Sequence, residues 1–149
     1  MKNVADELVE VVEQALPWLR DLSPVTTQQR PAPDRWTISE VIGHLIDSAA
    51  NNHQRFIRAQ ELSELTFPKY DQNSWVIKND YANSDWSEIL DLWRLYNRQL
   101  ARVIAQVPDD QLHTVCTIEP YEPCSLEFLI TDYLSHLKHH LRKIRERIE

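Results

Sequence analysis

Apolar side chains recur at intervals of three and four residues along four stretches of the chain, and no other feature restricts the possible folds as strongly. This spacing places them on one side of an α-helix, so each stretch is expected to be an amphipathic helix with one buried face. The predicted helices cover residues 2–22, 37–60 (or 62), 85–106 and 125–148. The pattern predicts an all-α protein in which four helices pack as a bundle.

Glycine is nearly absent, which supports the helical prediction. The chain of 149 residues has one glycine and eight prolines, whereas strands joined by tight turns usually need more glycine. This length is sufficient for one hydrophobic core, so we expect a single domain over residues 1–149, with long loops between the helices. Up-and-down packing is the default for such helices, although the long second connection permits a crossover.

The second predicted helix has the clearest start in the sequence. Thr37 and Glu40 match a capping box, in which each side chain accepts a hydrogen bond from the other residue's backbone N–H, and Trp36 can pack against Val41. The lone glycine, Gly43, lies inside this helix, where it costs about 1 kcal/mol relative to alanine. It indicates close packing, room left for a bound group, or simple tolerance of glycine.

The connections between the predicted helices differ in character. Pro17 predicts a kink or an early stop in the first helix, and residues 23–35 are expected to be a proline-marked linker. Residues 67–81 are too aromatic for a disordered linker, and a long loop of this kind is often functional, but it could equally plug the open end of a bundle. Residues 113–123 are predicted to be irregular, with extended character at 114–118.

Three of the six histidines lie close together in the last predicted helix. His136 and His140 are one turn apart on one edge of its apolar stripe, a spacing that lets two imidazoles reach a single metal ion. His139 lies further round, toward the polar face. Asp132, one turn before His136, could accept a ring N–H and fix its tautomer. The alternative is a helix end that carries histidines because they suit the negative end of the helix dipole.

A catalytic zinc site usually has three protein ligands and one open position, so a third histidine is needed. The second predicted helix offers His44 and His53. Periodicity slightly favours His53, which falls within the apolar stripe, whereas His44 lies at its flank. His44 shares its face with a polar strip that is a candidate pocket lining, formed by Ser48, Asn51 and Arg55. The pattern alone does not choose between the two histidines.

Charge and cysteine content argue against several classes of function. A net charge of −7 and the lack of a basic stripe argue against nucleic-acid binding. There is no apolar run of about 18 residues and no secretory leader, so we expect a cytoplasmic protein without a membrane segment. Cys116 and Cys124 are too few for a disulfide framework, and with His113 they lack the paired spacing of a structural zinc site.

Two motifs together resemble those of the DinB/YfiT superfamily of small helical metalloproteins. The first is Trp-Thr-Ile-Ser-Glu-Val-Ile-Gly-His-Leu at residues 36–45, and the second is Asp-Tyr-Leu-Ser-His-Leu-Lys-His-His at residues 132–140. A Tyr-Asp-Gln-Asn-Ser-Trp loop at residues 70–75 lies between them, so the likeness spans nearly the whole chain. Each piece is weakly specific, but their order and spacing together are fairly specific.

The resemblance implies a four-helix bundle that binds a divalent ion, zinc or nickel, through three histidines. By motif position these are His44, His136 and His140, which leaves His53 and His139 in supporting or structural positions. Members of the superfamily include S-transferases that use low-molecular-weight thiols such as bacillithiol, a mycothiol-dependent maleylpyruvate isomerase, and proteins described as metal-dependent hydrolases.

The implied function is that of a divalent-metal-dependent enzyme acting on a small molecule by thiol S-transfer or hydrolysis. An ion held by neutral imidazoles can lower the pKa of a bound water or hold a thiolate. Candidate acid–base groups are Asp47, Asp71 and Asp132. Because Leu137 follows His136, the glutamate of a His-Glu-x-x-His metalloprotease is missing.

Other functions fit the same residues. Many members of the superfamily have no assigned reaction, so the chain could be a stress-associated binding protein with a non-catalytic metal, or a helical bundle without metal. Bundles of this size commonly pair, and the tryptophan and tyrosine side chains of the third predicted helix could form the face of a homodimer.

Overall fold

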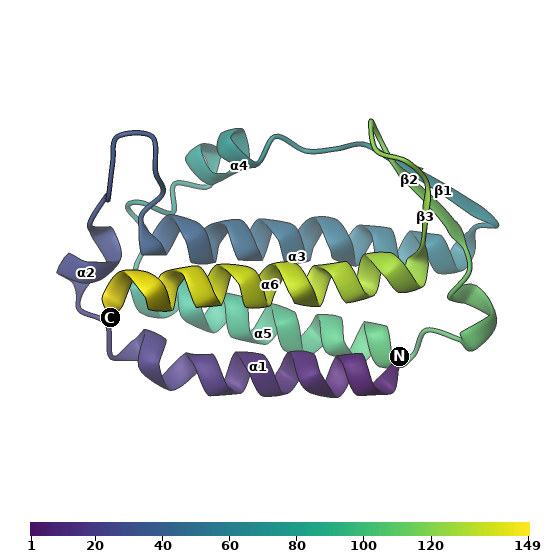
Figure 1. The fold of residues 1–149 in the computed structure, drawn as a ribbon, viewed down its shortest axis with the longest axis horizontal. Coiled ribbons are helices and arrows are strands. Elements are labelled where there is room, and N and C mark those ends of the chain that lie inside the picture. Colours follow the sequence, from purple (N-terminus) through teal and green to yellow (C-terminus); the bar gives the residue numbers. More distant parts are fainter.

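The computed structural model describes residues 1–149, and four long helices packed side by side form its body (Figure 1). These helices are α1 (Lys2–Arg20), α3 (Ile38–Glu61), α5 (Trp86–Ala105) and α6 (Leu126–Ile148). The shorter elements are α2 (Pro24–Gln28), α4 (Gln72–Lys78) and a 3₁₀ turn at Asp109–Gln111. The prediction of an all-α four-helix bundle is confirmed, and each predicted helix end lies within two residues of the observed one.

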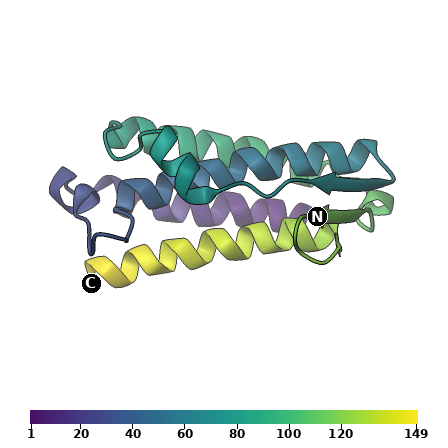
Figure 2. The same ribbon diagram turned by 90° about the horizontal axis from the view of Figure 1, so that it is seen from above.

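The directions of the four helices differ from the up-and-down default. α1 and α6 run one way along the bundle, whereas α3 and α5 run the other way (Figure 1). α3 and α5 also pack against each other, so these consecutive long helices are parallel neighbours. Residues 62–85, the crossover segment, therefore return along the length of α3 before α5 begins (Figure 1 and Figure 2). This is the crossover that the long second connection permits.

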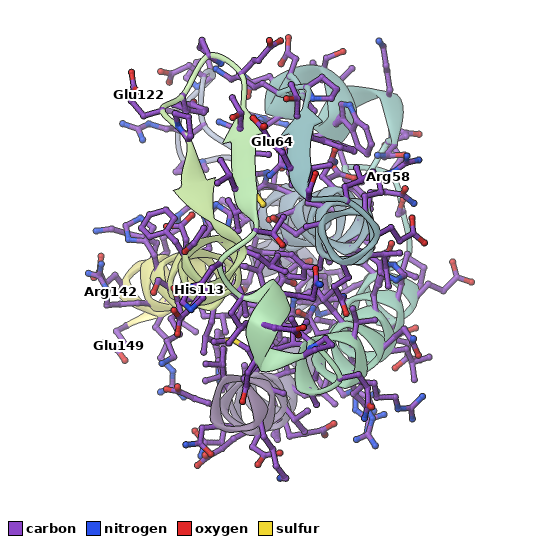
Figure 3. The ribbon with its side chains drawn as sticks, turned by 90° about the vertical axis from the view of Figure 1, so that its right-hand side faces the viewer. Arg58, Glu64, His113, Glu122, Arg142 and Glu149 are labelled. Carbon is purple, nitrogen blue, oxygen red and sulfur yellow. The ribbon has the colours of Figure 1, made fainter.

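A small sheet lies outside α3 and α6, on the side away from α1 (Figure 3). β1 (Glu64–Phe67) pairs in parallel with β2 (Val115–Ile118), which pairs antiparallel with β3 (Cys124–Ser125). Strand β2 confirms the extended character predicted at 114–118, whereas the sequence pattern gives no indication of β1. The sheet joins the crossover segment to the connection before α6, so both connections are held at the same end of the bundle.

Side-chain caps explain where several helices begin. The Thr37 hydroxyl accepts from the backbone N–H of Glu40 at 3.2 Å, and the Glu40 carboxylate accepts from the backbone N–H of Thr37 at 2.7 Å, so the predicted capping box is confirmed. Asp85 caps α5, and Ser125 caps α6. α1 ends one turn after Pro17, and the short α2 occupies part of the predicted linker.

A hydrophobic core of 34 buried residues lies between the four helices. Trp93 of α5 is completely buried in it, and Trp86 packs at its edge, where the indole N–H donates to the Leu19 carbonyl at 3.0 Å. These side chains therefore serve the core of one chain, and the homodimer stays a prediction. None of the helices combines the length and the apolar character that a membrane span requires.

The crossover segment docks on α3 at the lone glycine. The Tyr81 ring lies against Gly43 so closely that an added Cβ atom would come within 2.1 Å of it. Tyr81 is buried, and its hydroxyl donates to Oδ1 of Asp47 at 2.7 Å. Close packing, one of the explanations that the sequence leaves open, is therefore the reason for a glycine inside this helix.

Replacing Gly43 with alanine is expected to destabilise the protein by about 1–3 kcal/mol, because the new methyl group displaces Tyr81 from α3. This outcome opposes the gain of about 1 kcal/mol that alanine brings to an unconstrained helix. Urea unfolding of Gly43→Ala measures the change. In a Tyr81→Ala background the same substitution should be neutral or stabilising, and equal destabilisation in both backgrounds would contradict the explanation.

Candidate metal centre

Three histidines from two antiparallel helices meet between α3 and α6. His136 and His140 are one turn apart on α6, and their Nε2 atoms are 3.1 Å apart. His44 extends from α3, and its Nε2 lies 3.2 Å from Nε2 of His136. The three ligand atoms all lie within 4.8 Å of one another, and no other group of three histidine, cysteine or acidic side chains in the chain is arranged in this way.

The histidine cluster is closed on the α3 side and partly open on the α6 side. His44 is 1% exposed, and its Nδ1 has no hydrogen-bond partner in the protein. The ring of Trp36, the residue before the capping box, lies over His44 with 4.9 Å between the ring centroids. His136 and His140 are only partly buried. The side of the cluster that meets solvent is therefore formed by the two histidines of α6.

Burial keeps all three imidazoles neutral at physiological pH. It lowers the pKa of His44 to about 3, and repulsion from His136 and His140 adds to this effect. Burial also lowers the pKa of His140, to about 4, and lowers the pKa of His136, although the charge of Asp132 opposes the latter change. A neutral imidazole offers a lone pair, which is the form that binds a metal ion.

The spacing of the nitrogen atoms fits a single small cation. Bonds of about 2.0–2.1 Å to a tetrahedral ion place two ligating nitrogens about 3.3 Å apart. Nε2 of His136 lies 3.2 Å from that of His44 and 3.1 Å from that of His140, both close to that value, and all three ligand atoms lie within 4.8 Å of one another. Without a cation, a shared proton could join two of the nitrogens but would leave the third lone pair unsatisfied. The cluster therefore suggests a divalent metal of the kind that imidazole suits.

The remaining histidines lie elsewhere. His53 faces α5, where its Nδ1 is 3.4 Å from the Tyr96 hydroxyl, so the cluster contains His44 and not the histidine that periodicity slightly favours. His139 is exposed on α6. Cys116 is a buried free thiol and Cys124 a partly buried one, and neither belongs to the histidine cluster.

The sequence model of the DinB superfamily matches residues 4–144, which is nearly the whole chain. The chain belongs to the DinB superfamily. Among known proteins, the one named "Putative metal-dependent hydrolase YfiT" from Bacillus subtilis (strain 168) is 26% identical over 150 residues, which cover 97% of this chain and 84% of that protein.

A solved structure shows the same fold. It is described as "YfiT from Bacillus subtilis is a probable metal-dependent hydrolase with an unusual four-helix bundle topology". The TM-score is 0.82 at 22% identity, and the match covers 96% of this chain and 85% of that chain.

Asp47 is the only predicted acid–base candidate in this DinB-superfamily chain that is buried. Its Oδ1 accepts hydrogen bonds from the Tyr81 hydroxyl at 2.7 Å and from the Asn79 amide at 2.8 Å, whereas its Oδ2 is buried without a partner. Burial raises the pKa of this carboxyl to about 6, and the two hydrogen bonds limit the rise. A carboxyl that titrates near neutral pH, about one turn along α3 from His44, is suited to proton transfer.

The other two acid–base candidates have different surroundings. Asp71 is exposed and caps α4, where its Oδ1 accepts from the backbone N–H of Ser74 at 3.0 Å. Asp132 is also exposed and makes no hydrogen bond to His136, so the tautomer-fixing contact expected there is absent. The side chain of Asp132 remains in solvent, and its negative charge acts on His136 only through space.

The sequence pattern assigns no role to several side chains that lie around Asp47. Tyr70, Asn79 and Tyr81 belong to the crossover segment, and all three interact with Asp47. Burial and the charge of Asp47 raise the pKa of Tyr70 to about 12, so its phenol stays protonated. The aromatic content of residues 67–81 correctly predicts an ordered segment. This segment runs along α3 and does not plug the end of the bundle (Figure 2).

Asp47→Asn is expected to stabilise the metal-free protein at pH 8, because an amide can accept the same hydrogen bonds without a buried charge. The folded pKa of about 6 lies above the ordinary value of 3.8, so the folded state binds this proton more tightly and the wild type loses stability as pH rises between these values. The advantage of the variant should therefore shrink by about 1 kcal/mol between pH 8 and pH 5.

Urea unfolding of both proteins in the presence of a chelator measures this difference. The lowered pKa values of the histidines act in the opposite direction, because neutral imidazoles lose stability as pH falls, but they act equally in both proteins and cancel. A difference that stays constant from pH 8 to pH 5 would contradict the raised pKa of Asp47.

Proposed function

We propose that the chain is a divalent-metal-dependent enzyme that acts on a small molecule, with His44, His136 and His140 as the metal ligands. The convergence of three neutral Nε2 atoms, with separations of 3.1 and 3.2 Å along the cluster, carries this proposal. The name of the related Bacillus subtilis protein, which describes a metal-dependent hydrolase, supports the same class of function.

The partial exposure of His136 and His140 supports a catalytic site over a structural one. Structural zinc sites are closed by four protein ligands, whereas catalytic sites have three and keep one position for water or substrate. Only three candidate ligands converge here. The alternative, a stress-associated bundle protein with a non-catalytic metal, would be favoured by a tightly held ion that has no exchangeable water and no pocket beside it.

A bound ion would act as a Lewis acid that lowers the pKa of a water or holds a thiolate. The remaining roles belong to the chain. Trp36 covers the buried face of His44 and keeps water from that ligand. Asp47 is the acid–base candidate, because its carboxyl, about one turn along α3 from His44, gains or loses a proton near pH 6, while Tyr81 and Asn79 hold it in place through Oδ1.

Two reactions are the candidates, with zinc or nickel as the expected ion because imidazole suits both. In hydrolysis the nucleophile is water, and in S-transfer it is a low-molecular-weight thiol. The absence of a glutamate after His136 argues against metalloprotease chemistry and favours a small substrate. The cytoplasmic location stays a prediction.

The ligand set is tested by metal analysis of protein purified without an affinity tag. We expect about one divalent ion per chain in the wild type. The ion should be lost from His44→Ala, His136→Ala and His140→Ala, because two imidazoles hold an ion far more weakly than three. His53→Ala and His139→Ala are the matched controls and should keep it. An ion that survives His44→Ala but is lost from His53→Ala would refute the ligand assignment.

The nature of the nucleophile is tested with cobalt-loaded protein, whose absorption reports the ligands of the ion. A low-molecular-weight thiol that binds the metal should add a sulfur-to-cobalt charge-transfer band in the near ultraviolet. This band should be absent from His136→Ala loaded in the same way. A wild-type spectrum that excess thiol leaves unchanged would count against S-transfer and leave hydrolysis as the candidate reaction.

A further inference from the structure

Arg55 of α3 is a buried cation that no acidic side chain neutralises. The residue is 9% exposed, and no ion pair in the structure includes it. Its Nη1 donates to the side-chain oxygen of Asn52 at 3.4 Å, and its Nε is buried without a partner in the protein. Most of the five N–H donors of the guanidinium group are therefore free to bind a ligand.

The neighbours of Arg55 supply no negative charge at physiological pH. Its guanidinium carbon lies 5.6 Å from the centre of the Phe67 ring. Burial raises the pKa of Tyr70 to about 12 and also raises the pKa of Cys124, although the charge of Arg55 opposes both changes. Both groups stay neutral. A buried guanidinium without a counter-charge is unfavourable, and an anionic ligand would remove that penalty.

Arg55 shares a face of α3 with His44. The two residues are eleven positions apart, which is about three turns and leaves them about 20° apart around the helix axis. The rise of the helix separates them by about 16 Å along the axis, and long side chains on helices extend back toward the N-terminus, which shortens the distance to the guanidinium. The charges of Asp47 and Arg55, which lie between and at the end of this stretch of α3, both act on the pKa of Tyr70.

We propose that Arg55 binds an oxyanion group, carboxylate or phosphate, of the small molecule whose other end reaches the histidine cluster. This inference rests on the proposed function for the position of the reacting end, but the anion-binding role of Arg55 stands on its own burial and lack of a counter-charge. It defines the substrate or thiol as an elongated anion. Phe67, whose ring centre lies 5.6 Å from the guanidinium carbon of Arg55, would cover the charged end of that molecule.

Calorimetric titration of zinc-loaded protein with paired thiols tests the inference. Mercaptohexanoate should bind about tenfold or more tightly than mercaptohexanol, because a charge-assisted hydrogen bond to Arg55 forms only with the acid. Mercaptoacetate, which is too short to reach Arg55, should show no such advantage over mercaptoethanol. Mercaptohexyl phosphate distinguishes the two oxyanions, since the tighter of the two long anions identifies the group for which the site is shaped.

Two variants give the controls. Arg55→Met should abolish the preference for the acid while keeping the zinc ion and the affinity for mercaptohexanol. Its unfolding midpoint should stay the same or rise, because an unpaired buried charge is removed, whereas the loss of a purely structural arginine would lower it. Arg58→Met removes an exposed arginine from the same helix and should keep the preference (Figure 3). Equal binding of acid and alcohol by the wild type, or a preference that survives Arg55→Met, would overturn the inference.

A measurement without metal separates this inference from the proposed function. The side-chain Nε–H resonance of Arg55, assigned by its absence from Arg55→Lys, should shift when hexanoate or hexyl phosphate is added to chelator-treated protein, and it should not shift with hexanol. If neither anion shifts it at saturation, the inference fails even where the zinc site is intact. If the anions shift it but the protein takes up no zinc, the proposed metal function fails and the anion site stands.

Discussion

The antiparallel contact between α3 and α6 is the constraint on which the candidate site depends, because its three histidines come from both helices. A slip of one residue would move a side chain by about 1.5 Å along the axis and by about 100° around it, enough to separate His44 from its partners. Both ends of α6 are tied down. At its start the backbone N–H of Leu126 donates to Thr114 beside the sheet, and near its end Arg147 donates to the Trp36 carbonyl at 2.9 Å.

Helix α3 carries most of the buried polar atoms that lack a hydrogen-bond partner. Four buried side-chain atoms lack a hydrogen-bond partner in the protein, and three of them belong to α3: His44 Nδ1, Asp47 Oδ2 and Arg55 Nε. Evolution for stability alone would replace such groups with apolar ones, so their concentration along one helix is typical of a functional surface. The crossover segment covers this surface with tyrosine and asparagine side chains, which meet some of its hydrogen-bonding needs and leave others unmet.

The helices and the His136–His140 pair can be predicted from the sequence because both depend on local spacing. The third histidine and the small sheet can be predicted only in part. Periodicity fails to choose between His44 and His53 because α3 is central: from residue 37 to residue 49 every side chain is buried, so no exposed face defines a stripe. Strand β1 is not predicted by the sequence pattern, because its four residues form a strand only by pairing with β2, some fifty positions later. The superfamily resemblance, and not the helix pattern, predicts His44 as the third histidine of the cluster.

Two of the four long helices take no part in the candidate site. α1 and α5 pack against each other and fill part of the core, and neither contributes a side chain to the histidine cluster. The crossover segment, by contrast, packs directly on α3. It is held there by the pairing of β1 with β2 and by the packing of Tyr81 against Gly43. Substitutions between these two anchors can alter what the covered surface of α3 accepts without disturbing the core. This arrangement gives the fold evolvability, since one surface segment can change over a fixed set of three histidines.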